Sequence, residues 1–180
     1  MYKYTDKELK EIYDNIVILH AKNEQKNKHI LDYFDKKKVQ HKPYTLKTGD
    51  YSFMIKAIPK LGIVRDIYFD NSIAIERKAN LEELSNNIGN DRTRFTDELM
   101  RAKFKNMLFI IALEQGTWGD LSWHRYKTKY DNERFISTLN AFQIDYNVHI
   151  EMINDKIAFG HYIKKKFEMY AKRYFLATEI

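Results

Sequence analysis

The spacing of apolar residues along the chain changes several times and predicts alternating helices and strands. Near the N-terminus, Thr5 and Glu8 form a capping-box pattern in front of a short helix that ends at about Tyr13. The β-branched apolar run at residues 15–19 predicts a buried strand. Apolar residues at helical spacing then predict an amphipathic helix over residues 26–38.

After this helix the apolar period shortens to two, which is typical of strands. Turn-forming residues divide this part of the chain into four predicted strands at residues 44–47, 51–57, 63–69 and 72–77. Residues 81–88 and 92–103 then predict two helices that are interrupted at a glycine. The most apolar run, at residues 107–113, predicts a central strand.

The last third of the chain continues the alternation. It predicts a helix at residues 132–142, a strand at 148–153 and a long basic, aromatic helix at about 160–176. This order is typical of an α/β fold in which a mixed central β-sheet carries helices on both faces. No linker or repeat marks a boundary, so we expect a single domain over residues 1–180 with its core at about residues 15–153.

Composition narrows the class of protein. Hydrophobic residues make up 44% of the 180 residues, which excludes a disordered chain, and the absence of cysteine excludes disulfides and thiolate chemistry. We see no signal peptide and no apolar run that could span a bilayer, so we expect a cytoplasmic protein without a membrane partner. The net charge of +6 favours a nucleic-acid partner, although such a charge can also serve solubility alone.

The candidate chemistry lies at Asp50 and at the tripeptide Glu76-Arg77-Lys78. Because strand side chains alternate, Glu76 and Lys78 are expected on one face, where Asp50 can meet them if the two strands are neighbours. Two adjacent carboxylates need a cation, and oxygen ligands suit Mg²⁺ or Mn²⁺. With Lys78 to orient water or offset negative charge, these groups suit phosphodiester hydrolysis. The alternative is a solvated strand end with a surface ion pair.

The wider sequence resembles a known family over roughly residues 15–150. Residues 46–52 and 73–78 are similar to the Leu-x-x-Gly-Asp-Tyr and apolar-x-Glu-Arg-Lys signatures of XPF-type nucleases. Residues 91–95 look like the arginine-bearing helix of that family, and residues 108–114 look like its next core strand. The resemblance implies a restriction-endonuclease-like nuclease fold in a small phage or bacterial member.

The resemblance also implies roles for individual residues. Asp50 and Glu76 would be metal ligands, together with the main-chain carbonyl of Arg77, and Lys78 would be the catalytic lysine. Arg77 would support the site or hold a phosphate from the opposite face. Glu82 stands where the family has aspartate, and it would lie behind the metal ligands and orient them.

One segment departs from the family pattern. After the first strand the family carries Asp-x-Arg-Glu, whereas this chain has Ala21, Lys22, Asn23 and Glu24. Only Glu24 is retained, and we expect it to support the site from behind the ligands.

Two functions therefore remain open. The first is a Mg²⁺- or Mn²⁺-dependent endonuclease that cleaves branched or junction DNA in phage or bacterial recombination, replication or repair. The second is a catalytically impaired protein of the same fold that binds DNA or a host protein. The resemblance also allows a homodimer.

Two further groups of residues have alternative interpretations. Arg92 and Arg94 follow the active-site motif and are expected to contact DNA phosphates, unless they belong to a solvated helix face. Trp118 and Trp123 lie in an expected loop after the central strand, where they either cap a core or stack on unpaired bases.

Overall fold

The computed structural model describes residues 3–22 and 26–177, and the described residues form seven α-helices, seven β-strands and one 3-10 turn. The chain divides into two compact units, which we describe one at a time. The first unit comprises residues 1–46, 51–70 and 160–180. The second comprises residues 47–50 and 71–159 and contains Asp50, Glu76, Arg77 and Lys78.

The strands of the first unit pair in both directions. Strand β1 (Ile16–Ala21) pairs in parallel with β2 (His41–Tyr44) and antiparallel with β3 (Tyr51–Ile55). Strand β3 also pairs antiparallel with the short β4 (Ile67–Tyr68). The mixed pairing that the sequence predicted is therefore present.

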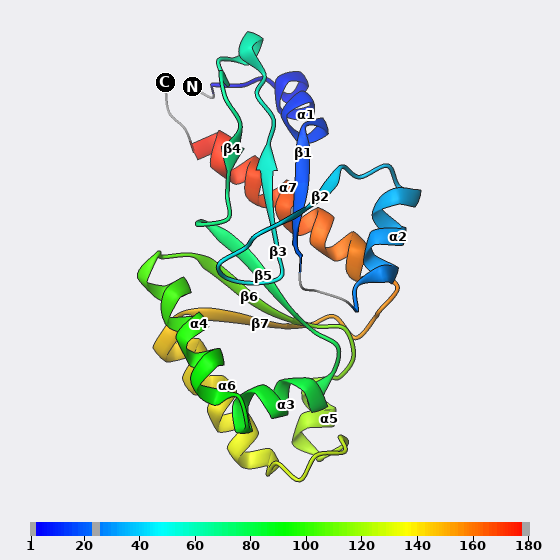
Figure 1. The fold of residues 1–180 in the computed structure, drawn as a ribbon, viewed down its shortest axis with the longest axis vertical. Coiled ribbons are helices and arrows are strands. Elements are labelled where there is room, and N and C mark those ends of the chain that lie inside the picture. Colours follow the sequence, from blue (N-terminus) through cyan, green and yellow to red (C-terminus); the bar gives the residue numbers. More distant parts are fainter. Residues whose placement is uncertain (1–2, 23–25, 178–180) are drawn as a thin grey trace. The chain divides into compact units, whose positions relative to one another are not determined.

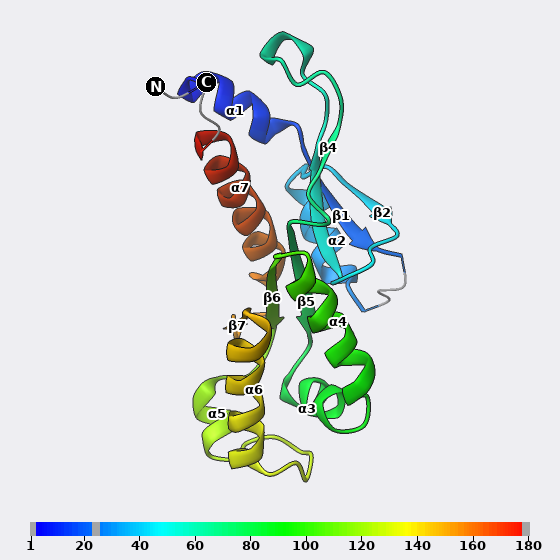
Figure 2. The ribbon, with the colours of Figure 1, turned by 90° about the vertical axis from the view of Figure 1, so that its left-hand side faces the viewer.

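Three helices and one short turn complete the first unit. They are α1 (Asp6–Asp14), α2 (Lys28–Lys36), η1 (Pro59–Leu61) and α7 (Phe159–Ala177). The capping box before α1 is formed, because Thr5 accepts from the backbone of Glu8 while the Glu8 carboxylate accepts from Thr5. Helix α7 lies along the face of the sheet (Figure 2), where the rings of Phe53 and Phe167 are 5.2 Å apart.

Two strand predictions in this unit were wrong in extent. The strand expected at residues 44–47 lies at 41–44, and it includes Pro43, which an edge strand tolerates. The strand expected at residues 63–69 shrinks to β4. Next to it, the Asp66 carboxylate accepts a hydrogen bond of 3.0 Å from the backbone N–H of Ala57, in place of a ladder contact.

The second unit is built on three parallel strands. They are β5 (Ile73–Lys78), β6 (Leu108–Leu113) and β7 (Val148–Met152). The connecting helices are α3 (Leu81–Gly89), α4 (Arg92–Phe104), α5 (Trp118–Ser122) and α6 (Asn132–Tyr146). Parallel strands joined by helices are buried on both sides, which explains their nearly continuous apolar sequences.

These helices cover one face of the three strands (Figure 1). Alternate strand residues such as Ala74, Phe109 and Ile111 form a buried cluster with Leu84 of α3 and Leu139 of α6. The face that carries Ala74 also carries the side chains two and four positions further along β5. The candidate residues Glu76 and Lys78 therefore lie at the carboxyl end of a parallel strand, which is where α/β sheets usually bind ligands.

The predicted α/β class is confirmed, and most helices lie within a few residues of their expected bounds. One helix was missed, since residues 118–122 were expected to be a loop. Helix α5 is too short to show a period, but Thr117 and Asp120 form a capping box at its start. None of the helices in residues 3–22 and 26–177 has both the length and the apolar character that a membrane span requires.

Candidate active site

Gly49 and Asp50 form a tight turn against strand β5. Gly49 has φ of +75°, and a Cβ at this position would lie 2.8 Å from the Cβ of Ala74, so both conformation and space require glycine. The backbone N–H of Asp50 donates to the carbonyl of Ile75 at 2.9 Å. The Asp50 Oδ2 atom accepts from the backbone N–H of Arg77 at 2.9 Å. The turn thus places the Asp50 carboxylate against the main chain between Glu76 and Lys78.

Glu76 and Lys78 form a buried ion pair. The Lys78 Nζ atom lies 2.6 Å from the Glu76 Oε1 atom, and both side chains are buried. The same ammonium lies 5.1 Å from the centre of the Phe95 ring of α4, close enough for a cation–π interaction. These contacts leave the lysine little freedom, so its charge is held at one place.

The surrounding charges perturb the pKa of both members of this pair. Burial raises the pKa of Glu76, and the carboxylates of Glu98 and Glu83 raise it further, while Lys78 opposes them. Burial alone would lower the pKa of Lys78, but the carboxylates of Glu76, Asp50 and Glu83 outweigh it and raise that pKa. Several carboxylates thus surround a single ammonium, an arrangement that favours an additional cation.

Glu83 and Glu98 are two members of the site that the sequence did not single out. The Glu83 Oε2 atom accepts from the backbone N–H of Ala79 at 2.9 Å, and the Glu98 Oε1 atom accepts from that of Gly49 at 2.7 Å. Glu98 lies three positions after Phe95 and therefore on the same helix face, which is the signal that could have revealed it.

Glu82, which stands at the position of the family aspartate, has a different contact. Its Oε1 atom accepts from the backbone N–H of Lys127 at 3.0 Å. Glu83, not Glu82, is the residue of this pair whose charge shifts the pKa values of Glu76 and Lys78. Glu24 lies outside the described residues.

Arg77 points to the opposite face of β5 and forms a two-pronged ion pair with Glu114. Its Nε and Nη2 atoms lie 2.8 Å and 2.9 Å from the two carboxylate oxygens of Glu114. The side chains are only 3% and 1% exposed. Glu114 follows β6, and its N–H donates to the carbonyl of Lys78 at 2.9 Å, so this pair ties the ends of the two strands together.

The carboxylates at this site fit a hard divalent cation by their chemistry. Asp50 and Glu76 supply oxygen ligands, the type that Mg²⁺ and Mn²⁺ prefer, in surroundings rich in negative charge. Within residues 3–22 and 26–177, no three His, Asp or Glu side chains already stand in a metal-binding arrangement. The contacts with the Arg77 N–H and the Lys78 ammonium use one oxygen of each carboxylate, Asp50 Oδ2 and Glu76 Oε1, and a carboxylate can accept further partners.

The network predicts how the titration of Glu76 responds to a neighbour. Replacing Glu98 with glutamine removes a negative charge but keeps an acceptor oxygen for the Gly49 N–H. Since Glu98 raises the pKa of Glu76, Glu98→Gln should move the Glu76 midpoint to lower pH. Carboxyl ¹³C NMR measures this midpoint, and Glu133→Gln on the exposed start of α6 is the control. Equal midpoints in wild type and Glu98→Gln would contradict the electrostatic contact.

Known proteins resemble this chain in sequence and in fold. The ERCC4 domain model matches residues 21–166. XPF from Aeropyrum pernix is a similar solved structure, with a TM-score of 0.62, 16% identity and coverage of 86% of this chain and 61% of that chain. XPF from Aeropyrum pernix in complex with DNA is a second similar structure. Its TM-score is 0.61 and its identity is 16%, and the match covers 87% of this chain and 66% of that chain.

The chain thus spans about two thirds of the length of the solved structures it matches. A comparison with curated protein sequences found no match. The family match covers most of the sequence, including both motifs of the site and the helices that follow them. We conclude that the chain belongs to the ERCC4 domain family of XPF-type nucleases.

Proposed function

We propose that this chain is a metal-dependent endonuclease that hydrolyses phosphodiester bonds in DNA. The observation that carries the proposal is the buried Glu76–Lys78 ion pair with the Asp50 carboxylate held against the main chain between its members. Burying a charge pair costs desolvation energy, and apolar residues in its place would often make the protein equally stable. Such a pair at the carboxyl end of a strand, with perturbed pKa values, is a strong candidate for a catalytic site.

Each residue has a definite part in this proposal. Asp50 and Glu76 would hold Mg²⁺ or Mn²⁺, which supplies Lewis-acid polarisation of the phosphate when it is bound. The raised pKa of Lys78 keeps its ammonium protonated, so it can stabilise the negative charge that develops on phosphate oxygens. Arg77, paired with Glu114, fixes the strand end that carries both neighbours.

The start of helix α4 supports DNA as the substrate. Arg92 and Arg94 are exposed there, and the first turn contains no acidic residue. Cations at a helix N-terminus are unfavourable for the helix dipole, whereas phosphate is favoured by both the dipole and the arginines. We therefore assign these two arginines to phosphate contacts. Preference for branched or junction DNA, and a role in phage or bacterial repair or recombination, are proposed from the family alone.

A second candidate is a DNA- or host-protein-binding role without efficient catalysis. The observation that favours it is Ala21, the last residue of β1, at the position where the family has a carboxylate after its first strand. An alanine cannot bind a metal ion, so the donor set would be poorer than that of the family.

Cleavage assays distinguish the two candidates. Labelled flap, fork, Holliday and linear DNA are incubated with the purified chain and either Mg²⁺ or Mn²⁺. We expect slow nicking of branched substrates that requires the metal and is lost in Asp50→Asn, because the amide is a weaker ligand than the carboxylate. Tight binding without cleavage of any substrate under either metal would instead support the binding role.

A further inference from the structure

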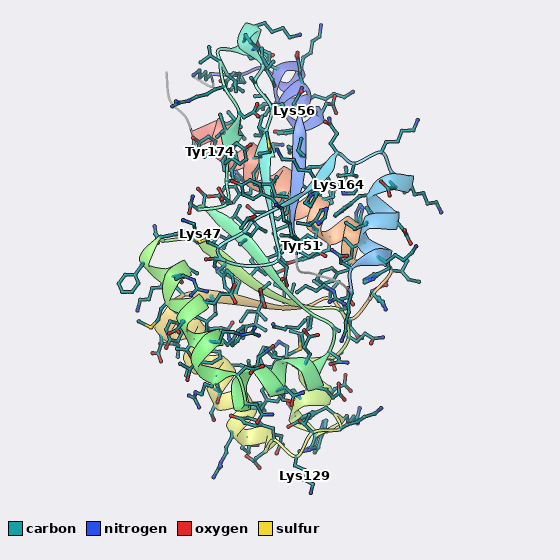
Figure 3. The ribbon with its side chains drawn as sticks, viewed as in Figure 1. Lys47, Tyr51, Lys56, Lys129, Lys164 and Tyr174 are labelled. Atoms are coloured by element: carbon teal, nitrogen blue, oxygen red, sulfur yellow. The ribbon has the colours of Figure 1, made fainter. Side chains whose placement is uncertain are left out.

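The connection between α5 and α6 exposes an unusual set of side chains. We call residues 123–130 the basic-aromatic loop. Trp123 is 75% exposed, and the Arg125 side chain is 67% exposed. Lys127 and Lys129 are exposed as well, and Figure 3 shows Lys129 pointing away from the helices of its unit. Trp123 therefore does not cap a core, in contrast to one of the two interpretations of the sequence.

The backbone of this loop is nevertheless held in place. The Lys127 N–H donates to Glu82 at 3.0 Å, and the hydroxyls of Ser85 and Thr128 lie 2.8 Å apart. Tyr126 is buried, and its hydroxyl donates to the carbonyl of Tyr130 at 2.7 Å. The loop is thus fixed to α3, while Trp123 and the two lysines remain in solvent. Arg125 is exposed as well, with its Nη1 atom 4.0 Å from the Asp120 Oδ1 atom. Little backbone conformational entropy would be lost when this loop binds a ligand.

A polar cavity of about 460 Å³ lies between the loop and the residues that follow β5 and β6. Its lining includes Asn80, Glu82, Gln115, Asp120, Arg125 and Lys127. Asn80 lies two residues after Lys78, at the N-cap of α3. The basic-aromatic loop therefore borders the space immediately beyond the end of β5.

We propose that the basic-aromatic loop binds an unpaired DNA strand beside the Glu76–Lys78 pair. Trp123 would stack on a base, and Arg125 and Lys127 would contact the phosphates that follow. An unpaired strand is the favoured ligand because a duplex hides the faces of its bases between neighbouring pairs. The inference rests on the proposed function for the chemistry at the adjacent site.

Glu82 is a positioning residue in this arrangement. Its carboxylate accepts from the Lys127 backbone, so it holds the loop in register with α3. Glu82→Ala should weaken strand binding, whereas Glu82→Gln keeps an acceptor oxygen and should restore it. A merely electrostatic role of the carboxylate would make the two variants alike.

Tryptophan fluorescence tests the stacking contact directly, since the chain has only two tryptophans. The variant Trp118→Phe retains Trp123 alone, and Trp123→Phe retains Trp118 alone. Oligothymidylate is titrated into each protein at low salt with divalent metal chelated, so that cleavage cannot interfere. We expect saturable quenching in Trp118→Phe and at most weak quenching in Trp123→Phe. Equal quenching in both, or none in either, would overturn the assignment of Trp123.

Binding measured by fluorescence anisotropy completes the test. Trp123→Ala should weaken oligothymidylate binding by about five- to 150-fold, the range that loss of one stacked base gives, and leave duplex binding unchanged. Phe104→Ala is the matched control, because Phe104 is an aromatic residue with 84% exposure at the end of α4. Equal losses for duplex and oligothymidylate, or no loss for either, would refute the loop proposal. Failure of the loop proposal can be distinguished from failure of the nuclease proposal. If Trp123→Ala binds oligothymidylate as wild type does and cleavage persists, only the loop proposal is wrong.

Discussion

Replacing Glu114 with alanine should lower the free energy of unfolding by about 3–5 kcal/mol, the cost of removing one member of a buried ion pair. The Arg77 guanidinium is 3% exposed and is bound by both oxygens of Glu114. Without this carboxylate, two strong hydrogen bonds to a desolvated charge are lost. Urea unfolding, monitored by circular dichroism, measures the change. The dependence of the unfolding free energy on urea concentration is compared between variants.

Two further variants make this measurement specific. Asp97→Ala removes an exposed carboxylate from α4 and should change stability by no more than about 0.5 kcal/mol. The double replacement Arg77→Met with Glu114→Leu removes both charges and should recover most of the loss, since apolar side chains can replace a buried pair. A loss below about 1 kcal/mol in Glu114→Ala would contradict the assigned role of the pair.

The sequence predicted that Asp50, Glu76 and Lys78 lie together, because local rules govern this geometry. Strand alternation places Glu76 and Lys78 on one face and Arg77 on the other, whatever the rest of the fold. Gly49 marks the turn before Asp50, and its positive φ and close contact with Ala74 show why no larger residue would serve there. Helices α3 and α4 were likewise separated correctly, since the apolar pattern ends near a glycine.

The surrounding residues could not be predicted, because they depend on helix phase and strand register. One residue along a helix rotates the side chain by about 100°, so the Asn80 cap decides that Glu83 and not Glu82 approaches Lys78. Glu114 ends the apolar run at residues 108–114, and nothing in the sequence pairs it with Arg77. Only the parallel pairing of β5 with β6 brings it to Arg77.

The exposure of Trp123 could not be predicted from the sequence either. Tryptophan is mostly buried in proteins, so its type alone favours a position at the edge of a core. The loop that holds it is instead fixed by Tyr126 and by backbone contacts with α3, which leaves the indole in solvent. The structure shows a large aromatic side chain exposed beside cations on a well-anchored loop. This exposure indicates a binding role, which the sequence position of Trp123 does not reveal.

Replacing Lys78 with methionine should reduce the rate of DNA cleavage by about 10²- to 10³-fold, the scale of one lost electrostatic stabiliser. The substitution keeps most of the length of the side chain but removes the ammonium that lies 2.6 Å from Glu76. DNA affinity should remain within about twofold, because ground-state binding draws on many other cations. Single-turnover cleavage and anisotropy on the same branched substrate measure the two quantities.

A variant of the two α4 arginines should instead lose DNA affinity and keep its cleavage rate. Arg92→Ala combined with Arg94→Ala should weaken binding to every DNA sequence, and each lost phosphate contact should reduce the salt slope by about 0.9. Once the substrate is saturating, this variant should cleave at nearly the rate of wild type, since neither arginine contacts the Glu76–Lys78 pair in any described interaction. If Lys78→Met lost binding and cleavage together, the ammonium would be serving substrate binding and not the stabilisation of developing charge. An unchanged salt slope in the arginine variant would in turn assign Arg92 and Arg94 to a solvated helix face.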